Sequence, residues 1–362
     1  MKKIGIDVRM IQHSGIGVRI QNILKYLPKQ SSEFEFILFG NKSQLEKYPF
    51  TSDYPIIDYN ANIYSISEFL GHPKMKDMDL LDIPHFNIPI KYFRKCVVTV
   101  HDLTPYVMRE YFPQISKRIY LQVIFRLLKK VKEIITVSEY TKKDLLKEFR
   151  YNQEKIKVIY NGLNSEVFYP RSQDEVNEFR KKYFLPEEFF LCVGIGKEHK
   201  NFGFIIRIMN KLWKSGEFQT PLAIAGTNGK LPDFLEEPAR EAGEKLILIP
   251  PLQYEELPLL YQSAKALIFP SLYEGFGFPL VEAQAVGCPV ISSNTTVMPE
   301  ILEDSALLFD PRKRESFLLA LNLFLSPTSP RKSLIEAGFK NVQRFRWEKS
   351  VEEILNVYRS VL

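Results

Sequence analysis

The chain has 362 residues, which is long for one hydrophobic core and suits two domains. Its apolar content of 45% and charged content of 25% are those of a globular protein, and no apolar run has the length of a membrane span. The formal charge of +6 suits an anionic substrate or a membrane surface and does not by itself indicate nucleic acid as a partner.

The three cysteines, Cys96, Cys192 and Cys288, lie far apart, and each is within or beside an apolar strand. This number and spacing predict core packing, and they indicate neither a disulfide framework nor a metal cluster. The first seven residues have the pattern of a strand start rather than a signal peptide, so we expect a cytoplasmic protein.

The N-terminal segment predicts a short buried strand over residues 4–8, a tight loop over 14–17 and a helix over 18–27. This order is similar to a dinucleotide-binding fingerprint only in part, because Ile20 occupies the position of the third glycine. A nicotinamide-dependent dehydrogenase is therefore poorly supported.

Gly15 and Gly17 make better sense as a second glycine loop, which faces the one predicted at residues 275–277. Arg19 follows this loop on the predicted helix. Its side chain is either a contact for a phosphate group or a solvated arginine, and the sequence favours neither interpretation.

Residues 34–39 predict the next strand, but the order of strands within residues 42–87 is not predictable from the pattern. The sequence Asp77-Met-Asp79 matches a metal-binding D-x-D motif. That motif belongs at the end of a strand, whereas these residues lie in a polar turn flanked by lysines, so we predict no metal there.

Residues 96–100 predict a buried strand that ends at His101 and Asp102. Open α/β sheets bind their ligands just beyond the carboxyl ends of parallel strands. A single histidine is usually structural, but its place at a strand end, directly before an aspartate, favours a role for His101 in a ligand site.

Residues 116–132 predict an amphipathic helix whose charged side chains are all positive. They are Lys117, Arg118, Arg126, Lys129, Lys130 and Lys132. A solvated face is the ordinary explanation for such residues. Because the excess has one sign, peripheral binding to anionic lipid on the inner face of the cell membrane is the second interpretation.

The second half of the chain predicts six short apolar strands with helical segments between most of them. These strands cover residues 190–193, 222–225, 246–249, 266–269, 289–292 and 306–309. Strands that alternate with helices predict a parallel, doubly wound sheet with right-handed crossovers.

The stretch from Phe269 to Ser292 contains a strand end, a loop with Gly275 and Gly277, and a helix that starts at Pro279. The first N–H groups of such a helix have no partner within the helix, and the helix dipole adds positive charge there. Because glycine has no Cβ, backbone at these two positions can approach a ligand closely. The sequence therefore predicts a cradle for phosphate groups.

Two carboxylates, Glu274 and Glu282, frame this predicted cradle. They suit an elongated ligand with hydroxyl groups at both ends and an anion between them, which describes a nucleotide-sugar. The alternative is that Glu282 only stabilises the helix start and Glu274 is solvated. The complete motif, with two glycines and two prolines at matching positions, favours a binding site.

Glu274-Gly-Phe-Gly-Phe-Pro-Leu-Val-Glu282 resembles the E-x7-E segment of the retaining glycosyltransferases of family 4 (group 1), and residues 260–264 and 287–292 match as well. The mannosyl- and rhamnosyltransferase branch is the most similar. The resemblance implies the GT-B fold, in which two Rossmann-like, doubly wound α/β domains face each other across a cleft. It implies an acceptor-binding domain over residues 1–168, a nucleotide-sugar-binding domain over 169–345, and a C-terminal helix over 346–362 that crosses back to the first domain.

The resemblance also implies roles for single residues. Lys200 lies in a segment similar to the family's G-x4-[RH]-K-N and would neutralise the donor diphosphate, while Asn201 would cap the next helix. His101 would contact the donor sugar near the reacting carbon, Glu274 would position sugar hydroxyls, and Glu282 would hold the ribose. The implied donor-binding residues are Gly15, Gly17, Gly194, Lys200, Gly226, Glu274, Gly275, Phe276, Gly277, Phe278 and Glu282.

The chain departs from the family at Ile195, where many members carry an arginine. Either Lys197 or Arg19 substitutes for it, or the diphosphate depends more strongly on Lys200 and the backbone cradle. Asp102 either orients His101 or bonds an acceptor hydroxyl, and Arg19 is a second candidate for acceptor contact.

The implied chemistry needs no metal and no cofactor, and the leaving phosphate oxygen deprotonates the acceptor hydroxyl. GDP-mannose is the favoured donor and a UDP-sugar the next. The expected acceptor is a glycan or a polyprenyl-linked glycan of a surface polysaccharide. Two alternatives stay open: a sugar-nucleotide epimerase of GT-B shape, and a non-catalytic protein that binds nucleotide-sugars.

Overall fold

The computed structural model describes residues 1–28, 32–111, 115–194, 197–227 and 230–362. They form two compact units, one of Met1–Gly162 with Phe345–Leu362 and one of Leu163–Arg344. The chain thus passes between the units after Gly162 and after Arg344, whereas the sequence placed these boundaries after residues 168 and 345.

The first unit is built on a parallel sheet, whose strand order among the described residues is β3-β2-β1-β4-β5-β6-β7. The strands are β1 (Lys2–Asp7), β2 (Phe34–Gly40), β3 (Ile56–Asp58), β4 (Leu80–Ile83), β5 (Cys96–Val100), β6 (Glu133–Thr136) and β7 (Ile156–Val158). Residues 42–87, whose strands the sequence did not order, supply the edge strand β3 and the central strand β4.

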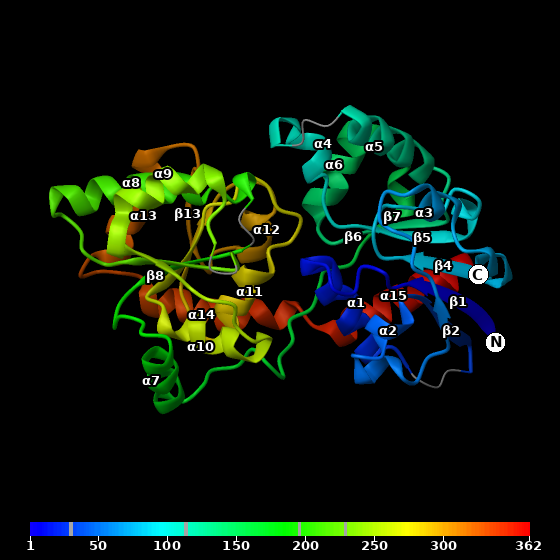
Figure 1. Ribbon diagram of the computed structural model, residues 1–362, viewed down its shortest axis with the longest axis horizontal. Helices are drawn as coiled ribbons and strands as arrows, with labels where there is room; N and C mark the ends of the chain where they lie inside the picture. The colour runs from blue at the N-terminus through cyan, green and yellow to red at the C-terminus, as the bar shows by residue number, and fades with distance from the viewer. Residues whose placement is uncertain (29–31, 112–114, 195–196, 228–229) are drawn as a thin grey trace. The chain divides into compact units, whose positions relative to one another are not determined.

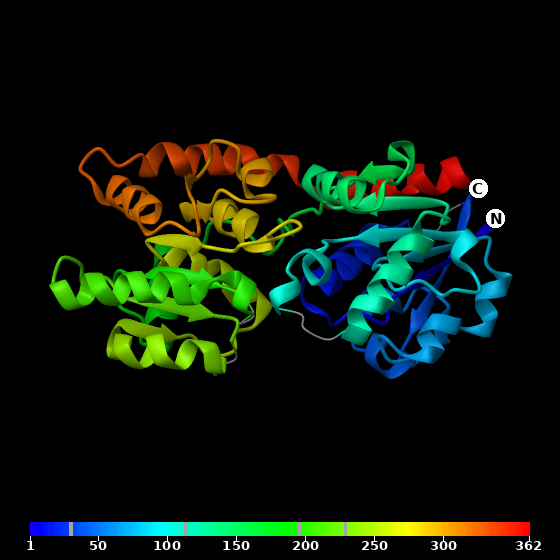
Figure 2. The same ribbon diagram turned by 90° about the horizontal axis from the view of Figure 1, so that it is seen from above.

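The helices of the first unit come from both ends of the chain (Figures 1 and 2). They are α1 (Ser14–Tyr26), α2 (Lys42–Leu45), α3 (Ile66–Leu70), α4 (Thr104–Val107), α5 (Ile115–Leu128), α6 (Glu139–Phe149) and the C-terminal α15 (Trp347–Val361). Helix α15 packs against α1, so the last residues of the chain complete the first unit. Ser138 caps α6, because its hydroxyl accepts a hydrogen bond from Thr141 N–H at 3.1 Å.

The second unit has a parallel sheet in the order β10-β9-β8-β11-β12-β13 within the described residues. Its strands are β8 (Phe190–Val193), β9 (Leu222–Ala225), β10 (Leu246–Leu248), β11 (Ala266–Phe269), β12 (Val290–Ser293) and β13 (Leu307–Phe309). The chain runs from β8 outward to β10 and then returns to the other side of β8, so the order reverses between β8 and β11. Ligands of open α/β sheets bind at such a reversal, beyond the carboxyl ends of the strands.

The helices of the second unit cover this sheet on both faces. They are α7 (Gln173–Lys182), α8 (Phe202–Ser215), α9 (Asp233–Ala242), α10 (Leu257–Ser263), α11 (Phe278–Ala285), α12 (Met298–Leu302), α13 (Arg314–Leu325) and α14 (Arg331–Asn341). Helices α8 and α9 lie side by side in both views (Figures 1 and 2). The prediction of two doubly wound α/β domains is therefore confirmed.

The strands are short and apolar because both faces of each sheet are covered. In the second unit, the side chains of Phe190, Ile268 and Ile291 are buried in one core with the apolar face of α8. All three cysteines are buried and unbridged, as their positions in apolar strands predicted. Among the described helices, none is both long enough and apolar enough to cross a membrane.

Candidate active site

Two glycines bring the carboxyl ends of β8 and β9 together in the second unit. Gly194 follows β8 and donates its N–H to Ala225 O at 3.0 Å, and Gly226 follows β9 with a φ of +93°. A Cβ at residue 226 would lie 2.8 Å from Gly194 O, which is too close for any side chain. The backbone at Gly194 and Gly226 therefore has no side chain of its own to cover it, at the point where the sheet order reverses.

Lys200 and Glu274 form an ion pair beside these strand ends, with Nζ 2.6 Å from Oε1. Their side chains are only 16% and 13% exposed, so each charge has lost most of its water and depends on the other. The backbone joins the two segments as well, because Leu272 N–H donates to His199 O at 2.8 Å. The sequence predicted both residues for the donor site, and the fold brings them into contact.

Helix α11 begins next to this ion pair. Gly277 precedes the helix with a φ of +87°, and Pro279 lies in its first turn. Phe278 is the first helical residue, one position earlier than the sequence predicted. Gly275 and Phe276 lie in the buried loop before it, and the Phe276 ring meets the Phe278 ring edge-on at 5.2 Å. Pro279 has no N–H, and Leu280 N–H donates to Gly277 O at 3.0 Å, so this turn presents the positive end of the helix dipole to the loop.

Glu282 is buried in the second turn of α11, with a relative exposure of 7%. The Tyr261 hydroxyl donates to its Oε2 at 2.8 Å. Burial raises the pKa of Glu282 to about 7, and the hydrogen bond from Tyr261 partly opposes this shift. The sequence predicted Glu282 for the site but did not predict its partner Tyr261. Tyr261 occupies a buried position of α10, which is the sequence feature that could have indicated it.

The prediction that the Asn201 side chain caps the next helix is wrong. Asn201 does precede α8, but its side chain accepts no hydrogen bond from the helix. Instead its Nδ2 donates to Pro311 O at 2.9 Å. The residue has a left-handed φ of +59°, which directs the side chain away from the α8 N–H groups and toward the segment after β13.

His101 lies at the end of β5 in the first unit, as predicted, and its Nε2 is 2.9 Å from Pro84 O. Because a carbonyl only accepts, Nε2 carries the proton and Nδ1 of the neutral ring is the acceptor. Burial, reinforced by the positive charge of Arg19, lowers the pKa of His101 to about 3. The ring is therefore uncharged at neutral pH and can accept a hydrogen bond from a hydroxyl group.

Asp102 does not orient His101, which corrects one of its two predicted roles. Its Oδ1 accepts a hydrogen bond from Thr104 N–H at 2.8 Å and so fixes the turn into α4. The carbonyl of Pro84 holds the imidazole instead. The other predicted role of Asp102, contact with an acceptor hydroxyl, stays a prediction.

Gly15 and Gly17 do not form a separate loop, because α1 already begins at Ser14. Both glycines lie in its first turn. A Cβ at residue 17 would lie 2.4 Å from Ile11 O, so Gly17 is required for the close packing of the preceding turn against the helix. The expectation of a loop over residues 14–17 was wrong because Gly17 N–H already donates to His13 O at 2.7 Å, which closes the first turn of the helix.

Both interpretations of Arg19 were wrong, because its side chain is completely buried within the first unit. Nη1 donates to Asn161 Oδ1 at 2.7 Å and to Ile159 O at 3.4 Å. Burial lowers the pKa of Arg19 to about 10, and the Asp82 carboxylate opposes this shift. An arginine enclosed by its own domain contacts neither a solvated phosphate nor an acceptor.

Asp77 ends a short 3-10 helix (Pro73–Asp77), and Asp79 contacts the start of the chain. Asp79 Oδ2 accepts from Lys3 N–H at 2.8 Å, and its other oxygen lies 3.8 Å from Lys2 Nζ. No group of metal-ligating side chains occurs in the described ranges of the chain. Ile195, where the family carries an arginine, lies outside the described residues, as does Gly229.

Comparisons with known protein families match both units. The profile described as "Glycosyltransferase Family 4" matches residues 13–167. The profile described as "Glycosyl transferases group 1" matches residues 175–341. The second match contains the strand ends, the ion pair and α11.

Curated relatives and solved structures agree with these profiles. The chain is 29% identical to O-antigen chain mannosyltransferase B of Escherichia coli, over 80% of this chain and 78% of that protein. It is 30% identical to O-antigen chain mannosyltransferase RfbU of Salmonella typhimurium, over 68% of this chain and 65% of that protein. The crystal structure of Anabaena HepE in complex with UDP-glucose superimposes with a TM-score of 0.79 at 16% identity, over 99% of this chain and all of HepE.

Proposed function

The chain belongs to the family 4, group 1 glycosyltransferases, which have the GT-B fold, and we propose that it is a retaining mannosyltransferase that uses GDP-mannose. The family and fold predicted from the E-x7-E segment are confirmed. The donor, the stereochemistry and the acceptor are the proposal.

The arrangement of Lys200, Glu274 and α11 carries this proposal. A cation, a carboxylate and the positive end of the α11 helix dipole lie beside two glycine turns at the reversal of the sheet order. An α11 N-terminus and an ammonium group suit a diphosphate. Glu274 suits the hydroxyls of the sugar on one side of the diphosphate, and Glu282 suits the ribose on the other.

Breaking the bond between sugar and phosphate builds positive charge on the anomeric carbon and negative charge on the departing diphosphate. Fixed positive groups at that diphosphate stabilise the transition state more than the bound donor. We propose that Lys200 and the positive end of the α11 helix dipole do this, and that the leaving phosphate oxygen takes the proton of the acceptor hydroxyl. The sugar then leaves one oxygen and joins another, with retention of configuration.

His101 is the proposed contact for the donor sugar in the first unit. Its neutral ring, with Nε2–H held by the Pro84 carbonyl, leaves Nδ1 as an acceptor for a sugar hydroxyl. An imidazolium at this place would repel the positive charge that grows on the anomeric carbon. The low pKa of His101 therefore supports a role as a hydrogen-bond acceptor rather than as a general acid.

The choice of GDP-mannose follows the relatives, both of which are named as O-antigen chain mannosyltransferases. The same names support a glycan acceptor in the synthesis of a surface polysaccharide. A UDP-sugar is the second candidate for the donor, because the HepE structure with a similar fold contains UDP-glucose.

A membrane-bound acceptor would bring the chain to a lipid surface, and we propose α5 as the contact. Ile119 and Val123 are 59% and 41% exposed on this helix, and Arg126, Lys129 and Lys130 are exposed near its end. Lys132 is excluded from this surface, because its Nζ donates to Val361 O at 2.8 Å. The side chains of Lys117 and Arg118 lie outside the described part of the chain. Exposed apolar and basic side chains on one helix suit anionic lipid.

A thermal-shift panel of nucleotide-sugars tests the donor first. GDP-mannose should raise the melting temperature more than UDP-glucose does, and the mixture should then release GDP and mannosylate a polyprenyl-linked glycan. NMR of the new linkage should show the configuration of the donor. Stabilisation by UDP-sugars alone would refute the choice of GDP-mannose. An epimerised nucleotide-sugar without any acceptor would identify an epimerase instead, and binding without a product would identify a non-catalytic protein.

A further inference from the structure

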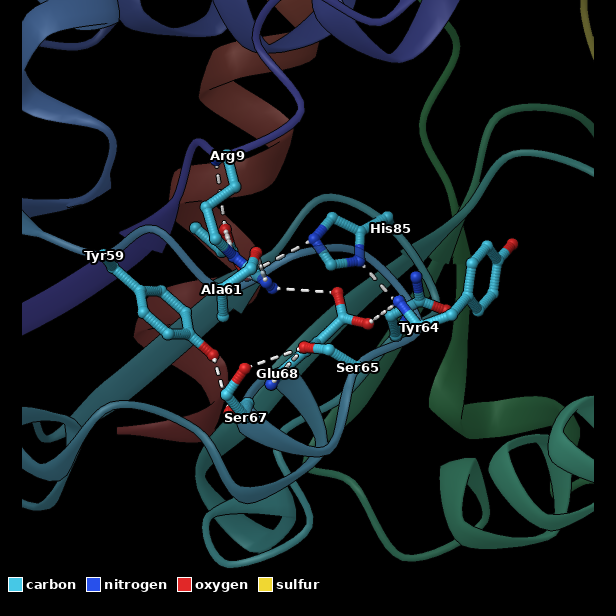
Figure 3. A network of polar contacts seen from close by, with 10 residues as sticks. Arg9, Tyr59, Ala61, Tyr64, Ser65, Ser67, Glu68 and His85 are labelled. Atoms are coloured by element: carbon cyan, nitrogen blue, oxygen red, sulfur yellow. Dashed lines mark hydrogen bonds and ion pairs between the residues drawn. The ribbon is translucent and has the colours of Figure 1, made fainter.

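Buried charges hold the segment of residues 59–68, which lies in the stretch of the first unit that the sequence did not resolve. Arg9 Nη2 lies 2.6 Å from Asp7 Oδ2 and 3.0 Å from Glu68 Oε1, and Nη1 donates to Ala61 O at 3.0 Å (Figure 3). Asp7 and Glu68 are 1% exposed. The Arg9 guanidinium also lies 4.4 Å from the centre of the Tyr59 ring. Three ionised side chains thus connect the end of β1 to this segment.

Glu68 fixes the backbone of Tyr64 through this network. Its second oxygen, Oε2, accepts the Tyr64 N–H at 2.6 Å, and its own N–H donates to the hydroxyl of Ser65, which caps α3 (Figure 3). Tyr64 has a φ of +65°, a left-handed conformation that costs free energy in a bulky residue. Buried ion networks give little net stability, so their best-supported use is to specify one conformation. Here that conformation is the strained backbone of Tyr64.

The network therefore fixes the position of the Tyr64 side chain, which is not fully buried. Tyr64 is 45% exposed, although its ring meets the Tyr120 ring edge-on, with 5.3 Å between centroids and 82° between planes. Tyr120 belongs to α5, so two distant elements hold one aromatic pair. A ring that served only the core would be covered on both faces.

Polar groups without protein partners lie in the same part of the fold. The Tyr120 hydroxyl is shielded from solvent and has no hydrogen-bond partner among the described residues, and the same holds for Oδ1 of the buried Asn87. A buried polar atom that lacks a partner costs free energy unless a ligand or water supplies one. Burial and the negative charges of the Glu68 and Asp102 carboxylates raise the pKa of the Tyr64 hydroxyl to about 12.

We propose that Tyr64 is the platform on which a pyranose ring of the acceptor stacks, with Tyr120 as a hydrogen-bonding neighbour. A sugar ring has an apolar face of C–H groups and a rim of hydroxyls, which fits an exposed tyrosine face beside shielded polar atoms. The Glu68 carboxylate, which accepts the Tyr64 N–H, favours a neutral, hydroxyl-rich ligand over an anionic one. This inference rests on the proposed function and assigns a specificity-determining residue to its acceptor.

The experiment measures saccharide binding to the full chain by saturation-transfer NMR, with methyl α-mannoside and a mannobiose as probes. The variants are Tyr64→Gly, Tyr64→Phe and the control Phe184→Ala. Glycine accepts a φ of +65° without strain, so Tyr64→Gly removes the ring while the loop keeps its conformation and the melting temperature does not fall. Phe184 is a matched control, because it is also an exposed aromatic residue with a left-handed φ, here +52°.

We expect wild type, Tyr64→Phe and Phe184→Ala to show saturation transfer to the saccharides, and Tyr64→Gly to lose at least nine-tenths of it. The thermal shift with GDP-mannose should be the same in all four proteins. Saccharide binding that persists in Tyr64→Gly, or that is absent from wild type, would overturn the inference. Loss of the GDP-mannose shift in Tyr64→Gly would also overturn it, because the residue would then act on the donor. If no nucleotide-sugar shifts wild type but the saccharide signal depends on Tyr64, the inference stands and the donor proposal fails.

Discussion

The ammonium group of Lys200 lies 2.6 Å from a carboxylate oxygen of Glu274. Both side chains are mostly buried, so each would carry an uncompensated charge without the other. A diphosphate is a second anion for the same ammonium group, which has three N–H donors. On the proposed function, a bound diphosphate therefore competes with Glu274 for Lys200, and the carboxylate becomes available to hydroxyls of the sugar.

We predict that Lys200→Ala lowers turnover by two or more orders of magnitude. The variant removes a fixed positive charge from the place where the departing diphosphate gains negative charge, and such donors are worth about 3–4 kcal/mol in the transition state. The matched control is Lys265→Ala, since Lys265 also forms a 2.7 Å ion pair, with Glu188. Steady-state release of GDP from GDP-mannose measures both. A nearly normal rate in Lys200→Ala would place the diphosphate elsewhere.

We predict that donor affinity falls by about tenfold between pH 8 and pH 6 because of Glu282. Its pKa is about 7, and only the ionised carboxylate accepts hydrogen bonds from both ribose hydroxyls. As the pH falls through 7 the carboxyl takes up a proton, and the fraction able to bind decreases. Calorimetric titration with GDP-mannose at several pH values measures this, and Glu282→Ala should bind the donor poorly at every pH.

The variant Tyr261→Phe tests the cause of this pH dependence. The Tyr261 hydroxyl stabilises the ionised form of Glu282, so its removal should move the midpoint of donor binding to higher pH. An unchanged midpoint, or an affinity that does not vary between pH 6 and pH 8 in wild type, would exclude Glu282 as the titrating group.

Most of the predicted site residues of the second unit are local to one strand, loop and helix, so the sequence already places them close together. Glu274, Gly277 and Glu282 lie within nine positions of each other, and Lys200 follows a strand end. The contact between Lys200 and Glu274 spans 74 positions and depends on the sheet order, which no periodicity specifies. Tyr261, the partner of Glu282, was missed for the same reason.

The first unit was less predictable because buried charges organise it. Arg19 and Asp82 lie within apolar patterns, where a charged residue is usually taken as the exposed side of its element. Arg19 instead pairs with Asn161, 142 positions away, and Asp82 with Tyr358, 276 positions away. A local sequence pattern cannot indicate partners that are this distant in the chain.

We predict that Gly162→Ala destabilises the first unit by several kcal/mol. A Cβ at residue 162 would lie 2.3 Å from Trp347 N and 2.7 Å from Trp347 Cα, so backbone would have to move. The control is Gly203→Ala, where the new Cβ would meet only side-chain ends, the nearest at 3.2 Å on Arg207. Because Gly203 lies inside α8, alanine there should be neutral or stabilise the chain by up to about 1 kcal/mol. Denaturant unfolding compares the two, and equal stabilities would refute the prediction.

We predict that Tyr358→Phe destabilises the first unit by about 1–3 kcal/mol, because Asp82 Oδ2 loses the 2.6 Å hydrogen bond from the Tyr358 hydroxyl in a buried place. Burial raises the pKa of Asp82 to about 6, and the hydrogen bond holds it from rising further. A carboxyl with a raised pKa loses its contribution to stability as the pH rises through that pKa. The cost of the substitution should therefore be larger at pH 8 than at pH 5.

Tyr169→Phe is the control for Tyr358→Phe. It removes an exposed hydroxyl that also has a 2.6 Å hydrogen bond, from Arg171, and stability should change little. Denaturant midpoints at the two pH values measure both variants, and a pH-independent loss in Tyr358→Phe would mean that the hydroxyl does not act on an ionising Asp82.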